Sequence, residues 1–288
     1  MNSLPIVFML SGSMVAALSL LALGLHVRQR QQRRLELTLT LHQLRLLRQL
    51  IAALQRHRGL SNGVLSGDSS LRAELAQTRQ TVDQHMQQSL MLSTTQREAW
   101  DALLDHWSRL RQSGHLTPEN NLTQHSLLIR NSLYLLEDIA VSADLTKEHP
   151  ALHYVAALWR DLVPAAEWAG QARALGTGLA AQGNSTAEQR VRLRFLYQKI
   201  EQSTQRTFTL LQDHAHRFPE STLSGVNGCA QAVNGLLACI DRDLLQGTTP
   251  TIAAPAFFAQ ATKTIDQLFA VVDAALGQLE RAHNITAQ

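Results

Sequence analysis

Hydrophobic residues recur at helical spacing in almost every segment of this chain, and Gly, Pro and short polar runs separate the segments. No strand-like alternation of apolar and polar positions competes with this pattern. The pattern therefore predicts an all-α protein. Its expected helices cover residues 35–65, 71–92, 93–112, 119–145, 150–181, 186–216, a segment after Pro219 to about 245, and 256–281.

Several expected helix ends carry residues that stabilise them. Ser93 and Gln96 have the spacing of a capping box, and Thr117 stands before Pro118 at an expected first helical position. Pro164 lies inside a helical pattern, where it either bends the helix or starts a new one.

The first 34 residues have the pattern of a membrane anchor with a basic flank. Residues 4–27 are almost wholly apolar, contain no Asp, Glu, Lys or Arg, and are long enough to cross a bilayer core of about 30 Å. The basic run Arg28–Arg34 follows directly, and the positive-inside rule keeps such a flank in the cytoplasm. The sequence thus predicts a single-pass protein of the bacterial inner membrane with a cytoplasmic C-terminal domain. No Pro or loop composition interrupts the following segment, so one continuous helix is expected.

Two other interpretations of this segment stay open. A cleaved signal peptide is disfavoured, because no Lys or Arg precedes the apolar run and no Ala-x-Ala site closes it. Exposure of the domain to the periplasm is the second alternative, and it would reverse the predicted orientation.

One arginine lies in the middle of an apolar helix face. Leu44, Leu47, Ile51 and Leu54 lead at helical spacing to Arg58, so this side chain is expected on the inward face. A buried guanidinium keeps its charge and needs acceptors for its donors. We therefore expect an anionic group beside Arg58.

The pattern around Arg58 returns around Arg173. When the two arginines are aligned, Gly63 matches Gly178 and the neighbouring leucines also match. Arg173 lies in an inward line rich in alanine, which permits close helix approach. The repetition indicates an internal duplication.

The duplication predicts two pseudo-repeated halves, at about 35–146 and 150–281, within one helical domain of residues 35–284. The expected fold is an N-terminal transmembrane helix followed by two antiparallel helical bundles that share long central helices.

Duplicated halves packed about a pseudo-twofold axis place equivalent residues near each other, so Arg58 and Arg173 are expected to face one another. Two guanidinium groups repel, and a small planar anion between them removes the repulsion. The alternative is that each arginine pairs with a carboxylate, such as Glu137, Asp138 or Glu167, and only fixes the helix packing.

Charge and cysteine content narrow the functions. The net charge of +3 and the pI near 9.2 come mostly from the basic flank, so nucleic acid is not an expected partner. Cys229 and Cys239 are expected about 15 Å apart along one helix, too far to bridge, which is compatible with a reducing compartment. No catalytic, cofactor or metal-binding motif is found, so the sequence predicts neither an enzyme nor a cofactor or metal site.

Three motifs resemble the bacterial nitrate- and nitrite-sensing (NIT) domain. They are Leu-Gln-x-x-Arg-Gly-x-Ser at Leu54–Ser61, the second arginine motif at Arg173, and a closing motif. The closing motif reads Phe257-Phe258-x-x-x-Thr262-x-x-Ile265-Asp266-x-Leu268. The resemblance covers roughly residues 44–279. It implies a pair of all-α four-helix bundles that bind nitrate or nitrite through arginines on inner helices and switch an attached output domain.

The resemblance also implies ligand-binding residues. Arg58 and Arg173 would contact the anion, in agreement with the pattern argument. Nitrate-responsive members have adjacent arginines in the first motif, where this chain has His57 and Arg58. A further arginine is expected from the last third of the domain, and Arg242 is the nearest candidate, although it lies off the apolar line of its helix.

The sequence therefore predicts a membrane-anchored sensor of a small oxyanion, nitrate or nitrite, that passes its signal to a separate partner protein. The route is direct contact or a shift of the helix that enters the membrane. A homodimer is left open. The alternative is a helical scaffold or assembly protein whose arginines are structural and which binds no small molecule.

Overall fold

A computed structural model describes the backbone of residues 4–65, 69–88, 90, 92–113, 117–145, 154–155, 158–213 and 220–282. It describes the side chains of these residues except 4–17, 70, 159 and 220–223. Within these ranges the chain is helical and contains no strand. The predicted all-α class is confirmed.

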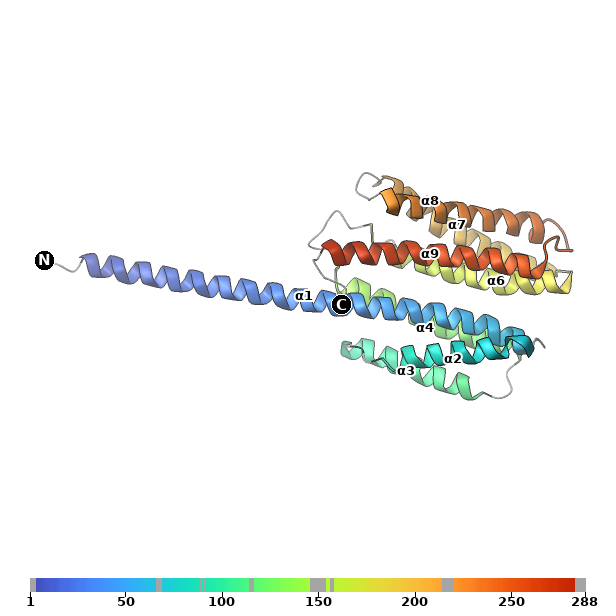
Figure 1. Cartoon of the computed structure of the whole chain (residues 1–288), viewed down its shortest axis with the longest axis horizontal. Helices are drawn as coiled ribbons and strands as arrows, with labels where there is room; N and C mark the ends of the chain where they lie inside the picture. The colour runs from blue at the N-terminus through green and yellow to red at the C-terminus, as the bar shows by residue number, and fades with distance from the viewer. Residues whose placement is uncertain are drawn as a thin grey trace.

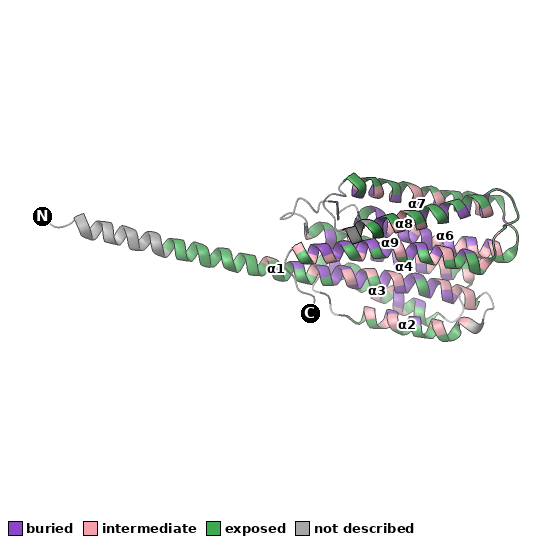
Figure 2. Cartoon of the chain, turned by 45° about the horizontal axis from the view of Figure 1, so that its top comes forward, coloured by how far each residue is buried: buried purple, intermediate pink, exposed green. Residues whose placement is uncertain are grey.

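The first helix, α1 (Leu4–Leu65), is continuous over 62 residues. Its N-terminal part projects away from the helical body (Figures 1 and 2), and the buried core begins at Leu37. The predicted anchor at residues 4–27 lies in this projecting part, and only its side chains from Leu18 onward belong to the described residues. In the part of the chain that the structure describes, no helix is both long enough and apolar enough to cross a membrane.

Among the described residues, the rest of α1 forms a first bundle with three further α-helices. A short turn, η1 (Ser69–Leu71), precedes the others, which are α2 (Arg72–Met86), α3 (Thr94–Gln112) and α4 (Pro118–Ser142). The expected caps are confirmed: Ser93 and Gln96 form a reciprocal capping box, and the Thr117 side chain accepts from the backbone of Asn120. These bonds satisfy amides that the helix leaves open.

Helix α2 ends six residues before the predicted boundary at 92. After Gln87 the chain leaves the helix, and Leu90 packs into the core with 3% of its surface exposed. The Leu90 carbonyl accepts a hydrogen bond of 2.9 Å from Arg97 Nη2. Burial of Leu90 and this hydrogen bond stabilise the chain here in place of the hydrogen bonds of further helical turns.

In the part of the chain that the structure describes, the second bundle contains four α-helices and two π-helical turns. In chain order these elements are η3 (Leu158–Leu162), α6 (Val163–Gln182), α7 (Ala187–Asp213), α8 (Glu220–Cys239), η5 (Ile240–Leu245) and α9 (Ala254–Ala282). Pro164 lies in the first turn of α6, directly after the π turn, so it starts a helix. Gly183 ends α6 with φ +70°, a conformation that glycine adopts without strain.

The two bundles lie side by side, with α1 and α4 facing α6 and α9 in the middle (Figure 1). The pairs α2–α3 and α7–α8 cover the outer sides. Across the middle, α1 packs against both α6 and α9, and α4 packs against α6. Buried residues gather along these central helices (Figure 2), so a side chain at this junction reaches both bundles.

One glycine permits close packing inside the second bundle. A Cβ atom at Gly176 on α6 would lie 2.3 Å from the ring of Phe257 and 2.9 Å from Leu244. Phe257 is fully buried, so its ring has no room to move away. Gly176 therefore holds α6 close to α9, two helices that carry the residues described next.

Candidate functional site

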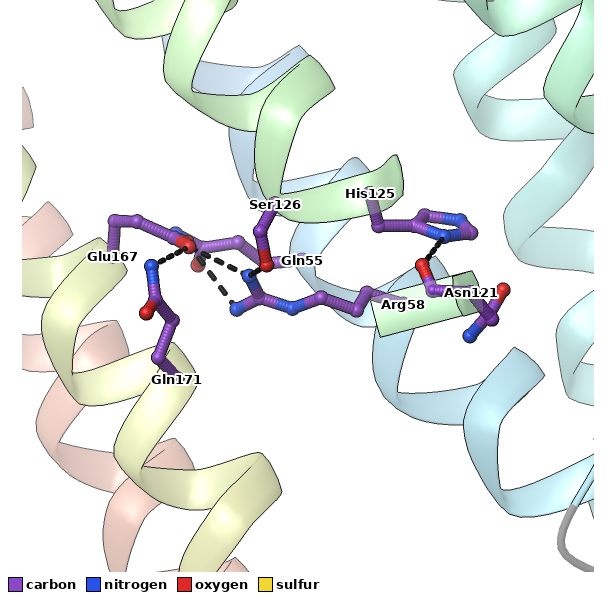
Figure 3. Close-up of polar contacts among 7 residues, drawn as sticks. All are labelled: Gln55, Arg58, Asn121, His125, Ser126, Glu167 and Gln171. Atoms are coloured by element: carbon purple, nitrogen blue, oxygen red, sulfur yellow. Dashed lines mark hydrogen bonds and ion pairs between the residues drawn. The ribbon is translucent and has the colours of Figure 1, made fainter. Parts of the chain in front are cut away.

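A buried ion pair joins the two bundles. Arg58 on α1 is 1% exposed and Glu167 on α6 is 3% exposed. Arg58 Nη1 donates to Glu167 Oε1 at 2.6 Å, and Nη2 donates to Oε2 at 3.3 Å. Arg58 Nη1 also donates to Ser126 Oγ on α4 at 3.0 Å (Figure 3). One guanidinium thus holds three central helices together.

Both oxygens of Glu167 have a second donor. Gln55 Nε2 donates to Oε2 at 3.0 Å, and Gln171 Nε2 donates to Oε1 at 2.9 Å (Figure 3). The carboxylate therefore accepts four hydrogen bonds, two of them from Arg58. Such a set of donors offsets the cost of removing a carboxylate from water.

A glycine makes room for this pair. A Cβ atom at position 170 of α6 would lie 2.9 Å from Arg58 Nη2. Gly170 lies between Glu167 and Gln171 along the helix, so the guanidinium passes directly over the α6 backbone. A larger residue here would push Arg58 away from its partner.

This arrangement decides between the two sequence interpretations for Arg58. The structure shows the alternative, in which a carboxylate, here Glu167, neutralises the arginine. The expectation of two unpaired arginines facing each other is wrong for Arg58. The physical reason is that Glu167, on the same inner helix as Arg173, places its carboxylate within hydrogen-bond distance of the Arg58 guanidinium.

Arg173 has different surroundings. It is 8% exposed, its Nη1 donates to Thr262 Oγ1 at 2.9 Å, and its Cζ lies 4.9 Å from the centre of the Phe258 ring. It forms no ion pair with any residue that the structure describes. A hydroxyl and an aromatic face stabilise a cation but do not neutralise it.

Burial and neighbouring charges lower the pKa of Arg173 to about 10. Burial is the largest cause, and the positive charges of Arg58 and Arg56 act in the same direction, while Asp266 and Glu167 oppose them. Arg173 still carries its charge at neutral pH. A lowered pKa of this origin indicates a cation that would be stabilised by an anion beside it.

Arg173 opens onto a pocket of about 410 Å³ between α1, α2 and α9. Gln55, Thr262 and Asp266 line it together with Arg48 and Arg56. These last two arginines already have carboxylate partners, since Arg48 pairs with Asp273 at 2.7 Å and Arg56 pairs with Glu74 at 2.6 Å. Arg173 is thus the cation of this pocket that has no carboxylate partner among the described residues.

His57 points into the first bundle. Its Nδ1 lies 2.8 Å from His125 Nε2, and its ring packs edge-on against Trp107. His125 Nδ1 lies 2.8 Å from the carbonyl oxygen of Asn121 (Figure 3), which can only accept. His125 therefore carries its proton on Nδ1 and accepts from His57 on Nε2, so the proton of His57 lies on Nδ1. His57 Nε2 is then a buried acceptor, and no described residue donates to it.

Both histidines are neutral at physiological pH. The pKa of His57 falls to about 3, first because of burial and then because of His125 and Arg79. The pKa of His125 falls to about 4, first because of burial, with Arg58 and His106 adding to the shift and the bond to Asn121 opposing it. His57 is not among the residues that line the Arg173 pocket. The structure therefore does not bring this predicted site residue to Arg173.

Arg242 also lies away from Arg58 and Arg173. Its side chain is 73% exposed, and it pairs with its neighbour Asp243 at 2.6 Å. It lines neither the Arg173 pocket nor the pocket beside Glu167. Its position off the apolar line of its helix leaves it on the surface.

Several polar residues of the junction were not predicted as site residues from the sequence. Ser126 accepts from Arg58 and His125 contacts His57, while Gln55 and Gln171 donate to Glu167. Single polar residues in amphipathic helices are common, so none of these positions stands out by itself. One signal was present: Gln171 follows Glu167 by four residues, which is the spacing of a helical side-chain pair.

Comparisons with known proteins agree with this architecture. A family model described as nitrate and nitrite sensing (NIT) matches residues 49–280, a range that contains Arg58, Glu167, Arg173 and Thr262. The structure of the NasR transcription antiterminator is similar to this chain with a TM-score of 0.70 and 20% identity. The match covers 92% of this chain and 74% of that one. No curated protein matches the chain by sequence.

The solved structure supports the fold at this level of identity, whereas the family model matches most of the chain by sequence. The match includes both arginine motifs and the closing helix that carries Thr262. The chain therefore belongs to the nitrate- and nitrite-sensing (NIT) family.

Proposed function

We propose that this protein senses a small oxyanion, nitrate or nitrite, which binds at Arg173. The observation that carries the proposal is a buried cation, lining a pocket of about 410 Å³, without a carboxylate partner in the described structure. Thr262 and Gln55 line the same pocket and offer polar groups beside the guanidinium. A planar anion matches the planar guanidinium with two parallel hydrogen bonds.

Arg58 takes part through its charge and not through a free guanidinium edge. Its hydrogen bonds to Glu167 and Ser126 fix it in place, and its charge disfavours the unneutralised Arg173. An anion at Arg173 relieves this repulsion. The strength of this repulsion depends on how α1 and α6 are placed relative to each other. Binding of the anion therefore stabilises one arrangement of the two helices more than another.

Replacing Arg173 by Ala tests the proposal directly. We expect nitrate and nitrite to release or absorb heat on binding the full-length wild-type protein in calorimetry, and this heat to vanish in Arg173→Ala. The matched control is Arg242→Ala, which removes an exposed arginine outside the pocket and should bind as the wild type does. Equal binding by both variants would place the anion elsewhere.

The scaffold interpretation has one observation in its favour. The Arg58–Glu167 pair joins the bundles without any ligand, as a structural ion pair would. Silence of the wild-type protein toward nitrate, nitrite and other small oxyanions in the same calorimetry would favour the scaffold.

We further propose that the N-terminal part of α1 anchors the protein in the inner membrane, with the helical body in the cytoplasm. Large apolar side chains are exposed on all sides of the projecting helix and lack cover from the body; they are Leu18, Leu20, Leu21, Leu23, Leu25 and Val27. Arg28 and Arg30 follow them. An exposed apolar surface of this kind needs a lipid or protein environment.

Membrane attachment has a simple test. The full-length protein is expected to stay with the membrane fraction after alkaline carbonate washing, and a reporter fused to the C-terminus should be active only in the cytoplasm. The control carries Asp at Leu18, Leu21 and Leu25 and should appear in the wash. Release of the wild type would exclude an integral anchor, and reporter activity in the periplasm would reverse the orientation.

We propose that the signal leaves the bundle through contact with a second protein or through a shift of α1. Arg33 of the basic flank donates to the carbonyl oxygens of Ala143 and Asp144 at the end of α4, at 2.9 and 3.2 Å. The projecting helix is thus connected to a second inner helix of the first bundle. We propose that movement of α6 relative to α1 and α4 is what a partner protein detects.

A further inference from the structure

Three buried charges meet at the junction of the bundles, and they do not cancel. Among the charged Asp, Glu, Lys and Arg side chains that the structure describes as buried, Arg58, Glu167 and Arg173 lie here, while Asp161 lies elsewhere beside Arg206. Two positive charges and one negative charge leave an excess of one positive charge. Buried charges are screened far less than surface charges, so this excess acts on whatever occupies the pocket.

The other charges at the rim of the pocket are paired or exposed, so they do not belong to this buried excess. Arg48 and Arg56 each have a carboxylate partner. Asp266 lines the pocket and stabilises the charge of Arg173 in the same direction as Glu167, but it is exposed and stays in place when Glu167 is replaced. The arginines Arg130 and Arg192, which line the pocket on the other side of Glu167, are also exposed. Water and salt screen exposed charges at these positions.

Glu167 is built to stay where it is. Its oxygens accept four hydrogen bonds from Arg58, Gln55 and Gln171, and a ligand that displaced it would leave these donors and a buried carboxylate without partners. Removal of one member of such a group is costly. Glu167 therefore remains a fixed negative charge when the pocket is occupied.

We propose that Glu167 sets the valence of the bound anion. With Glu167 in place the buried cluster offers one uncompensated positive charge, which a monovalent anion neutralises and a divalent anion overcompensates. This inference rests on the proposed binding of an oxyanion at Arg173. It assigns to Glu167 a role in specificity, since the carboxylate acts through Arg58 and the local charge and makes no contact with the ligand.

The test compares nitrate with sulfate in the wild type and in Glu167→Gln. Gln has nearly the shape of Glu, and its amide oxygen still accepts from Arg58, but the buried excess rises from one charge to two. We expect the wild type to bind nitrate at least tenfold more tightly than sulfate in calorimetry. In Glu167→Gln the ratio of the two dissociation constants should shift toward sulfate by at least tenfold.

Glu137→Gln is the matched control. Glu137 lines the same pocket as Glu167 on the α4 side, and no hydrogen bond or ion pair connects it to Arg58 among the described contacts. This variant should keep the wild-type ratio. If Glu167→Gln is too unstable for calorimetry in nitrate, the midpoint of its thermal unfolding is measured in sulfate and in nitrate at equal ionic strength. Sulfate should then raise this midpoint more than nitrate does.

The outcomes separate the inference from the proposed function. An unchanged ratio, a loss of nitrate binding in Glu167→Gln, or equal rescue by both anions overturns the role of Glu167 while wild-type nitrate binding stands. A wild type that binds no oxyanion overturns both. A shift of equal size in Glu137→Gln would show that any carboxylate near the junction has this effect, which also contradicts a specific role for Glu167.

Discussion

Replacing Arg58 by Met will lower the free energy of unfolding by about 3–5 kcal/mol, the range found when one partner of a buried ion pair is removed. Met fills part of the volume of the side chain, so the loss comes mainly from Glu167, which stays buried at 3% exposure. Gln55 and Gln171 still donate to it, but neither carries a charge. Urea unfolding followed by tryptophan fluorescence measures the change.

Two further variants show whether the loss has this origin. Arg56→Met breaks the Arg56–Glu74 pair two residues away, whose side chains are 66% and 44% exposed, and should cost less than about 1 kcal/mol. The double variant Arg58→Met with Glu167→Met removes both buried charges and should recover most of the loss. If the double variant is as unstable as Arg58→Met, the unpaired carboxylate is not the cause.

Lowering the pH from 6.5 to 5 will destabilise the protein by about 2 kcal/mol for each of His57 and His125. The reason is that the unfolded state takes up a proton that the folded state does not, and each such proton costs up to about 1.4 kcal/mol per pH unit. Their pKa values fall from 6.5 in the unfolded chain to about 3 and about 4 in the folded protein. The unfolded chain therefore binds protons first as the pH falls. This stability is fully present well above pH 6.5 and is lost progressively as the pH falls to about 4 for His125 and about 3 for His57.

His57→Gln and His42→Gln provide the comparison on one helix. His57 is 4% exposed, whereas His42 is exposed. The free energy of unfolding of His57→Gln should depend less on pH between 7.5 and 5, and that of His42→Gln should follow the wild type. Trp107 packs against the His57 ring, so its fluorescence reports on this site. A flat wild-type profile would mean that the histidines are hydrated.

The helical architecture was predictable because its signals are local. Apolar periodicity, the capping box at Ser93 and the cap at Thr117 each depend on residues a few positions apart, and all three are confirmed. The inward position of Arg58 and Arg173 followed from the same periodicity. The end of α2 was predicted wrongly because burial of Leu90 is a tertiary effect.

The partners of the two arginines could not be predicted from the sequence. Arg58 and Glu167 are 109 positions apart, and the sequence pattern did not distinguish Glu167 from the other carboxylates that were possible partners of Arg58. The duplication suggested equivalent surroundings for Arg58 and Arg173, but Glu167 lies close enough to neutralise only one of them. Symmetry of the sequence therefore did not extend to the charges, and this asymmetry is what leaves Arg173 without a counter-ion in the described structure.

The uninterrupted course of α1 gives the molecule a lever. Between Val27 and Arg58 the helix has neither Gly nor Pro, the residues at which helices most often kink. At 1.5 Å per residue this stretch is about 47 Å long, so a tilt of about 2° at Arg58 moves its far end by about 1.6 Å. A displacement too small to disturb the packing around Glu167 is thereby magnified at the end of the helix that projects from the body.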